Sequence, residues 1–293
     1  MAMLPNPLPR LADDLTGGAL GLRLPQGRLI DETDEGPWHE PLLWCAEDPA
    51  GPDTWQRFLP ARAVGLHPVL IEFDEKGAGG PGEWELAPQE TSYPGDHAPE
   101  DVLAELWGFD DTDEEFGAEK ARLVAPFGRE WPGLAPESGL DADSGADAGA
   151  GADPAAGDDP DPDDQAAAVA EELVDLELLA APRLALVHAR RSADIPAAIG
   201  WSGPVNHVGD VAELCAVLRS WEDRFGIRVV ALSFDTLTVS VASPPRTLRQ
   251  AEALAAEHLA FCPDNITQGR FDTLSAYAEH FLLNAPYWRF WWD

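Results

Sequence analysis

Three residues that can do chemistry lie close together near the end of a helical segment in the last third of the chain. His258 and Cys262 are four residues apart, so a helix places them on one face, and Asp264 follows just past the helix end. An imidazole, a thiolate and a carboxylate are the groups of a zinc site, or of a nucleophile with its base. The same face carries Ala251 and Leu254, and buried cysteines and half-buried histidines are common. We therefore favour a packing role and keep a catalytic site as the alternative.

A second candidate lies in the polar loop before the best-specified helix, which is expected from Asp210 to Gly226. Asn206 and His207 precede a helix start, where backbone N–H groups can bind an anion and where loop residues often carry function. The alternative is that Asp210 is only the helix cap and His207 a solvated residue. If the protein is a small enzyme, its site lies near His207 and the three residues above.

The C-terminal residues are rich in aromatic side chains. Trp288, Phe290, Trp291 and Trp292 can form a binding surface, but the favoured interpretation is a terminal strand that seals the core and leaves one or two rings partly exposed. The candidate binding residues are Asn206, Trp201 and Trp291.

Charged residues of the 210–226 helix carry a less specific signal. Arg219, Glu222, Asp223 and Arg224 have the spacing of ordinary i, i+4 support, with Arg219 and Asp223 as one such pair. We expect them to lie on a solvated face.

No metal site and no cofactor is predicted. The acidic runs at 31–35 and 110–115 lack the Gly and the closing Glu of a calcium loop. The cysteines at 45, 215 and 262 are too scattered for a disulfide framework or a paired metal motif. The sequence also lacks GxSxG, HExxH, P-loop and GxGxxG elements.

The segments that must position these residues are clearest after residue 183. Asp210 and Glu213 form a capping pair at the start of an amphipathic helix, and Thr247 with Gln250 forms another before a helix that Pro263 stops. Two β-branched runs around Asp235-Thr236 predict a hairpin. The expected elements are helices over 166–181, 210–226, 247–262 and from 272 or 273 through 281, and strands over 184–189, 228–234, 237–242 and 287–292.

The front of the chain predicts a small β-α-β unit, with strands over 42–46 and 68–74 and a helix over 54–63, followed by a short helix over 99–108. Together with the C-terminal order, this indicates the α+β class. We expect a mixed or antiparallel C-terminal sheet with a central hairpin and helices on one face, and a smaller α/β domain before it.

The domain division rests on one segment. Residues 137–165 consist almost wholly of Ala, Asp, Gly, Pro and Ser, with the single large apolar residue Leu140, so this segment cannot offset its ordering entropy. The prediction is an acidic N-terminal region over 1–136, a disordered linker over 137–165 and a C-terminal domain over 166–293. Limited proteolysis should cut the linker first and leave a C-terminal fragment that unfolds cooperatively.

The net charge of −34 is distributed unevenly. Residues 183–293 hold 10 Arg and 12 acidic residues, whereas residues 1–136 hold 27 acidic against 9 basic residues, and 137–182 hold 14 acidic and no basic residues. Such a surface repels nucleic acids and anionic membranes, so the expected partners are basic proteins, cations or none, and a basic protein is the partner that the favoured hypothesis names. The N-terminal residues do not form a secretory signal and no run approaches 18 apolar residues, which favours the cytoplasm.

Several short motifs of the C-terminal part occur in combination, and this combination resembles a bacterial domain of unknown function, number 4253. The resemblance covers roughly residues 184–293, and the acidic front half is similar to what members carry ahead of that domain. The family has no assigned activity, so the resemblance implies an intact fold and no catalytic residue. The motifs are Gly200-Trp201, Asn206, SWEDRFG at 220–226, FDTL at 234–237, Pro244-Pro245, AEH at 256–258, CPDN at 262–265 and WRFWWD at 288–293.

Two function hypotheses remain. The favoured one is a non-catalytic intracellular interaction protein, similar in kind to an immunity or adaptor protein, that covers a basic partner with its acidic front half. The alternative is a small enzyme with its site near His207, His258, Cys262 and Asp264. The sequence leaves the oligomeric state open.

Overall fold

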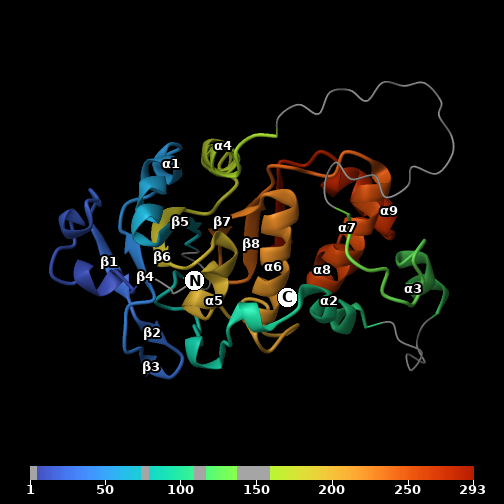
Figure 1. The fold of residues 1–293 in the computed structure, drawn as a ribbon, viewed down its shortest axis with the longest axis horizontal. Helices are drawn as coiled ribbons and strands as arrows, with labels where there is room; N and C mark the ends of the chain where they lie inside the picture. The colour runs from blue at the N-terminus through green and yellow to red at the C-terminus, as the bar shows by residue number, and fades with distance from the viewer. Residues whose placement is uncertain (1–4, 74–78, 109–116, 137–158) are drawn as a thin grey trace.

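A mixed seven-stranded sheet forms the centre of the computed structural model, which describes residues 5–73, 79–108, 117–136 and 159–293 (Figure 1). The strand order is β1-β4-β6-β5-β7-β8-β9; β5 and β7 are parallel, and the other neighbouring strands are antiparallel. Helices surround this sheet, which confirms the α+β class. The strands are β1 (Gly27–Ile30), β4 (Leu43–Ala46), β5 (Leu66–Ile71), β6 (Arg183–His188), β7 (Arg228–Leu232), β8 (Thr236–Ser240) and β9 (Tyr287–Trp291), and a separate two-stranded ribbon contains β2 (Glu32–Thr33) and β3 (Gly36–Pro37).

The central sheet interleaves strands from both sides of the predicted linker. Strand β6 of the C-terminal part lies between β4 and β5 of the front part, and β5 in turn pairs with β7. The predicted β-α-β unit therefore exists as β4, α1 and β5, but its two strands are separated by β6. The division at residues 1–136 and 166–293 stays a prediction, and the shared sheet argues against independent folding of the C-terminal fragment.

Helix α4 (Pro162–Asp175) begins inside the segment predicted as linker. The Asp161 side chain accepts a hydrogen bond from Asp163 N, and Pro162 occupies the first helical position, where its missing N–H costs nothing. The helical start thus lies before the predicted boundary at residue 165. Residues 137–158 lie outside the described residues.

Helices cover both faces of the sheet, not one face as expected. All six residues of β5 are buried, which is typical of a strand covered on both sides. Leu70 and Val230 pack with α1 (Thr54–Phe58) and α4, whereas Val69 and Val229 pack in a larger core with α6 (Val211–Phe225) and α7 (Leu248–Phe261). Figure 1 shows α1 and α4 at the top of the view and α6 and α7 to the right of the strands.

Local sequence signals account for the two helices that carry the candidate residues. Asp210 accepts a hydrogen bond from Ala212 N at 2.9 Å, and Gly226 ends α6 with a φ of 61°, the left-handed conformation that glycine adopts without strain. Thr247 and Gln250 form a reciprocal capping box at the start of α7. Both predicted helices are therefore confirmed, with their predicted caps.

The remaining helices are short. Helix α2 (Pro99–Trp107) packs on α6 and α7, and the last turn before β9 is a π-helical segment, η7 (Ala278–Leu282). In the part of the chain that the structure describes, no helix has both the length and the apolar character needed to cross a membrane. The others are η1 (Leu8–Leu11), η2 (Gly18–Leu20), η3 (Leu59–Val64), η4 (Pro88–Glu90), η5 (Pro94–Asp96), α3 (Ala118–Leu123), η6 (Ser192–Asp194), α5 (Ile195–Ile199), α8 (Asp264–Thr267) and α9 (Leu274–Tyr277).

Candidate functional site

His258 is a fully buried residue of α7. Its ring lies among the rings of Trp221, Trp288 and Phe290, with centroids 4.8 to 4.9 Å away. Its Nδ1 lies 3.1 Å from the hydroxyl of Tyr277, and its Nε2 has no hydrogen-bond partner. Burial lowers the pKa of His258 to about 3, so the imidazole is neutral in the folded protein. An imidazole in this position packs the aromatic core and does not reach a substrate in solvent.

Cys262 ends α7 and is buried as well. Its thiol donates to the carbonyl oxygen of Trp291, with the sulfur 3.0 Å away, and lies 3.6 Å from Oδ1 of Asn265. Burial raises the pKa of the Cys262 thiol to about 12. The protonated thiol is therefore a hydrogen-bond donor to strand β9, whereas a nucleophile or a zinc ligand requires the thiolate.

The other predicted site residues also bind main chain. Asp264 accepts a hydrogen bond from the N–H of Asp293 at 3.0 Å, and Asn206 donates to the carbonyl oxygen of Asp293 at 2.9 Å. Nε2 of His207 lies 2.9 Å from the carbonyl oxygen of Ala260. Asp264 and Asn206 thus bind the main chain of the last residue, whereas His207 binds the main chain of α7.

Asn265, which the sequence analysis does not name as a site residue, binds the main chain of β9 through its side chain. Its Nδ2 donates to the carbonyl oxygen of Arg289 at 2.7 Å, and its Oδ1 accepts from Trp291 N at 3.0 Å. The carboxamide pairs with the outer edge of β9 as the peptide group of another strand would, and so covers an edge that invites unwanted pairing. We call Asn206, Cys262, Asp264 and Asn265 the C-terminal anchor.

The two tryptophans among the binding candidates differ in role. Trp201 is buried, and its Nε1 donates to the carbonyl oxygens of Ser233 and Phe234 at 2.9 and 3.1 Å, which ties it to the hairpin loop. Trp291 is 37% exposed and donates from Nε1 to Asp235 at 3.0 Å. With Phe281, Tyr287 and Arg289, Trp291 lines an open cavity of about 590 Å³. Of these two tryptophans, Trp291 alone faces a space that a ligand can enter.

Three of the four charged residues of α6 do not lie on a solvated face, which corrects the sequence expectation for Arg219, Glu222 and Arg224, whereas Asp223 is exposed as expected. Arg219 forms a bidentate pair with Asp194, at 2.5 and 2.9 Å, instead of the expected i, i+4 pair with Asp223. Its guanidinium also lies 4.9 Å from the centre of the Tyr93 ring. The side chains of Arg219 and Asp194 are only 14% and 9% exposed.

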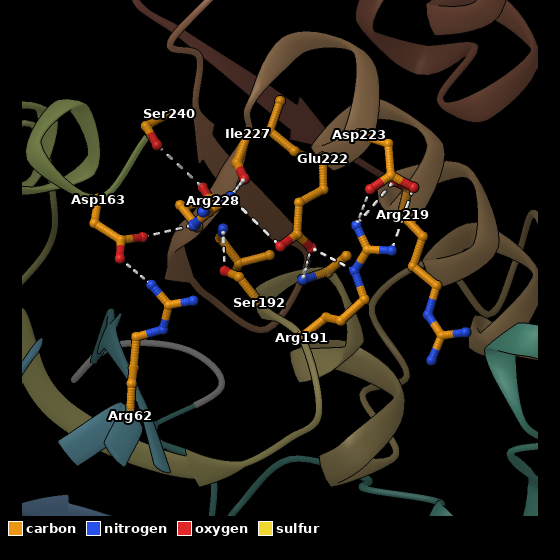
Figure 2. Close-up of polar contacts among 12 residues, drawn as sticks. Arg62, Asp163, Arg191, Ser192, Arg219, Glu222, Asp223, Ile227, Arg228 and Ser240 are labelled. Carbon is orange, nitrogen blue, oxygen red and sulfur yellow. Dashed lines mark hydrogen bonds and ion pairs between the residues drawn. The ribbon is translucent and has the colours of Figure 1, made fainter. Parts of the chain in front are cut away.

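Alternating charges form a chain of ion pairs that joins the front part to the C-terminal part, as Figure 2 shows. Arg228 lies 2.7 Å from Asp163 of α4 and 3.4 Å from Glu222 of α6. Arg191 then bridges Glu222 at 3.3 Å and Asp223 at 2.5 Å. Since Asp163 also pairs with Arg62 of η3, four of the molecule's elements and the loop after β6 are connected. In order, the residues of this series of ion pairs are Arg62, Asp163, Arg228, Glu222, Arg191 and Asp223.

A buried carboxylate contacts Trp221 and Arg224, at the same end of α6 as these ion pairs. Glu257 is fully buried, and its two oxygens accept from the guanidinium of Arg224 at 2.8 and 2.6 Å. The same oxygens accept from Trp221 Nε1 at 2.7 Å and from the main-chain N–H of Ala135 at 2.6 Å. Arg224 also donates to the carbonyl oxygen of Ala135 at 2.8 Å. We call Trp221, Arg224 and Glu257 the Ala135 clamp.

A metal-binding arrangement is not found in the described ranges, where no group of three or more His, Cys, Asp or Glu side chains is placed to hold a metal ion. The acidic run at 31–35 forms the β2–β3 ribbon and its turn. The run at 110–115 lies outside the described residues.

Comparison with known proteins identifies only the C-terminal part. Residues 183–293 match the family described as a domain of unknown function (DUF4253), which confirms the resemblance that the motifs of this part predict. The match contains the C-terminal anchor and the Ala135 clamp, but not Ala135 itself. No curated protein and no solved structure matches the chain.

Proposed function

We propose that the chain is a non-catalytic cytoplasmic interaction protein whose acidic front half binds a basic protein. The observation that carries this proposal is that arginines of the C-terminal part are engaged in internal ion pairs, whereas carboxylates of the front half are exposed. Arg191, Arg219, Arg224 and Arg228 are engaged in internal ion pairs, with side chains 30%, 14%, 9% and 15% exposed. These four of the ten arginines of the C-terminal part therefore do little to neutralise the acidic surface of the front half.

Exposed carboxylates gather on the β2–β3 ribbon and the segment beside it. Glu32, Asp34 and Glu35 of the ribbon are exposed, as are Glu85 and Glu90 of the neighbouring segment. The two segments are held together, because Asp34 N donates to the carbonyl oxygen of Leu86 at 3.2 Å and Gln89 donates to the Asp34 carboxylate at 2.8 Å. We call these five carboxylates the acidic edge. Like charges on one surface raise the association rate of a partner of opposite sign.

The contacts of the enzyme candidates support the non-catalytic half of the proposal. His258 and Cys262 are buried, with pKa values shifted so that both are neutral. Asp264 accepts from the main chain of Asp293, and His207 contacts the main chain of α7. A general base or nucleophile must instead reach a reacting atom.

The same charge argues against nucleic acids and anionic membranes as partners, since both repel a chain of net charge −34. The three cysteines are free and buried, which supports a reducing compartment such as the cytoplasm.

The test compares charge at two positions in the full chain. The variant E32Q/D34N/E35Q neutralises part of the acidic edge, and the matched control E171Q/E172Q/D175N removes the same charge from exposed positions of α4. The immobilised full chain is used to capture partners from the native host, and association of the captured protein is then timed at low and high salt.

We expect a basic partner whose association with the unmodified chain slows steeply as the salt concentration rises. At low salt, its association with the edge variant should be several-fold slower than its association with the control variant. Recovery of no partner, or equal slowing in both variants, contradicts the proposal.

A further inference from the structure

The family-matched residues 183–293 direct three polar side chains at a main-chain segment that the family match does not include. Trp221 and Arg224 of α6 and Glu257 of α7 belong to the match, whereas Ala135 precedes it. We infer that the Ala135 clamp is a binding site for a peptide segment without helix or strand, and that residues 129–136 of the same chain fill this site. The inference concerns a region separate from the acidic edge and does not depend on it.

The contacts recognise a peptide group and not a side chain. Glu257 accepts from Ala135 N at 2.6 Å while Arg224 donates to Ala135 O at 2.8 Å, so both polar atoms of one residue are bound. A buried carboxylate is costly unless its oxygens are fully hydrogen-bonded. Since Glu257 is fully buried, the N–H of a bound peptide supplies one of the four hydrogen bonds that stabilise it there.

The segment's other contacts define the kind of peptide. The side chain of Ala135 is buried, with the residue only 3% exposed, so the clamp position requires a small residue. Leu134 packs partly buried against the main core. Trp131 meets the Trp107 ring edge-on with centroids 5.6 Å apart. The expected ligand is thus a peptide with a small residue at the clamp, an apolar residue before it and an aromatic residue four positions before it.

The position of the segment fits a bound ligand. Residues 131–136 belong to no helix or strand, and Figure 1 shows this green stretch after α3 running beside α7. Arg129 at its start is held by Trp107 of α2, whose Nε1 donates to its carbonyl oxygen at 2.8 Å. The segment is held by side-chain packing and by hydrogen bonds to side chains. A second peptide of the same sequence can make the same contacts.

The first experiment uses the unmodified full chain and a synthetic peptide, REWPGLAP, which repeats residues 129–136. Hydrogen exchange at the Ala135 amide is followed by mass spectrometry with and without millimolar peptide. We expect this amide to exchange faster than the amides of β5, and added peptide to accelerate it several-fold, because the peptide occupies the clamp whenever the segment opens. Exchange as slow as in β5 and insensitive to peptide overturns the inference, since the segment is then a permanent part of the core.

The control peptide carries N-methylalanine at the position of Ala135. In this peptide a methyl group replaces the hydrogen of the N–H that donates to Glu257. The control peptide should therefore not accelerate exchange at the Ala135 amide. If both peptides accelerate exchange equally, the clamp does not recognise the peptide group and the inference fails.

The second experiment removes the segment from the clamp. A glutamate at the buried position of Ala135 cannot be accommodated, so the A135E chain should release the segment and bind fluorescent REWPGLAP, measured by anisotropy. Adding E257Q should weaken binding about tenfold or more, whereas adding E252Q on the same helix should not. Absence of binding by a folded A135E chain, or equal binding with E257Q and E252Q, contradicts the inference. If A135E does not fold, the exchange measurement decides.

Discussion

A hydrogen bond of 2.6 Å joins the main-chain N–H of Ala135 to the carboxylate of Glu257, two residues that are 122 positions apart in the chain. The bond is buried, and Arg224 completes it from the other side by donating to the carbonyl oxygen of Ala135. Like the pairing of β4 and β5 with strands of the C-terminal part, it attaches the front part of the chain to the C-terminal part.

The first prediction concerns the isolated fragment 166–293. Strand β6 pairs with β4 and β5, so the fragment loses both neighbours of β6, and with β5 it loses the strand that lies between β6 and β7. We expect broad, non-cooperative urea unfolding, whereas the full chain should unfold cooperatively. A sharp transition of the fragment, followed by circular dichroism, would show that the C-terminal part folds by itself.

The second prediction concerns the buried ion pair of the clamp. In E257Q, the Arg224 guanidinium loses its counter-charge in an interior position, which costs about 3–5 kcal/mol. The control is D272N, which breaks the exposed pair of Asp272 with Arg122, where both side chains are more than 60% exposed. That change should cost less than about 1 kcal/mol. Urea denaturation of the full-length variants measures both, and similar costs would contradict the assigned burial.

The third prediction concerns pH. Burial lowers the pKa of His258 from 6.5 to about 3, so between these pH values the unfolded chain binds a proton that the folded chain does not. The stability that the protein gains from keeping His258 neutral is fully present above about pH 6.5. As the pH falls below this value, the free energy of unfolding decreases by about 1.4 kcal/mol per pH unit for one proton. His67, with its pKa lowered to about 4 by burial and by the nearby Arg62 and Arg228, acts in the same direction.

Replacing His258 by Phe keeps an aromatic ring in the core and removes this titration. The dependence of unfolding free energy on pH between 4 and 6 should become shallower by about one proton in H258F. An unchanged slope in H258F would mean that His258 is protonated in the folded protein.

The fourth prediction concerns the edge of β9. N265A removes two hydrogen bonds to the main chain of β9 and should destabilise the protein by about 1–2 kcal/mol. N206A removes one exposed hydrogen bond to Asp293 and should cost less. Chemical denaturation measures the loss of stability in both variants. A loss in N265A that is no larger than the loss in N206A would show that Asn265 does not hold the strand.

The elements that were predicted well have their signals in neighbouring residues. Helices α6 and α7 combine apolar residues at helical spacing with caps at Asp210 and Thr247, and both begin at those caps in the structure. The hairpin of β7 and β8 follows from two β-branched runs with a short turn between them. Strand β1 was missed because its four residues include the exposed Arg28 and alternate poorly.

The contacts that matter most for the candidate site have no local signal. Spacing along one helix predicts only pairs within that helix, so it assigned Arg219 to Asp223 although Arg219 pairs with Asp194. The role of Asn265 depends on β9 being an edge strand, which is a property of the whole sheet. His258, Cys262 and Asp264 lie along α7 and just past its end, and burial and the position of the last residues decide what they do.

The account rests on the claim that the chemically capable residues near the C-terminus hold the fold and do not react. Cys262 tests it most directly, because a nucleophilic or metal-binding role requires an accessible thiolate. Native full-length protein is treated with a thiol reagent at pH 8, and modification of Cys262 is followed by residue-resolved mass spectrometry over a urea series. The account predicts that Cys262 is modified only at the rate of global unfolding, since its thiol is buried with its pKa raised to about 12. Rapid modification of Cys262 in the folded protein, without urea, would contradict the claim and favour the enzyme hypothesis.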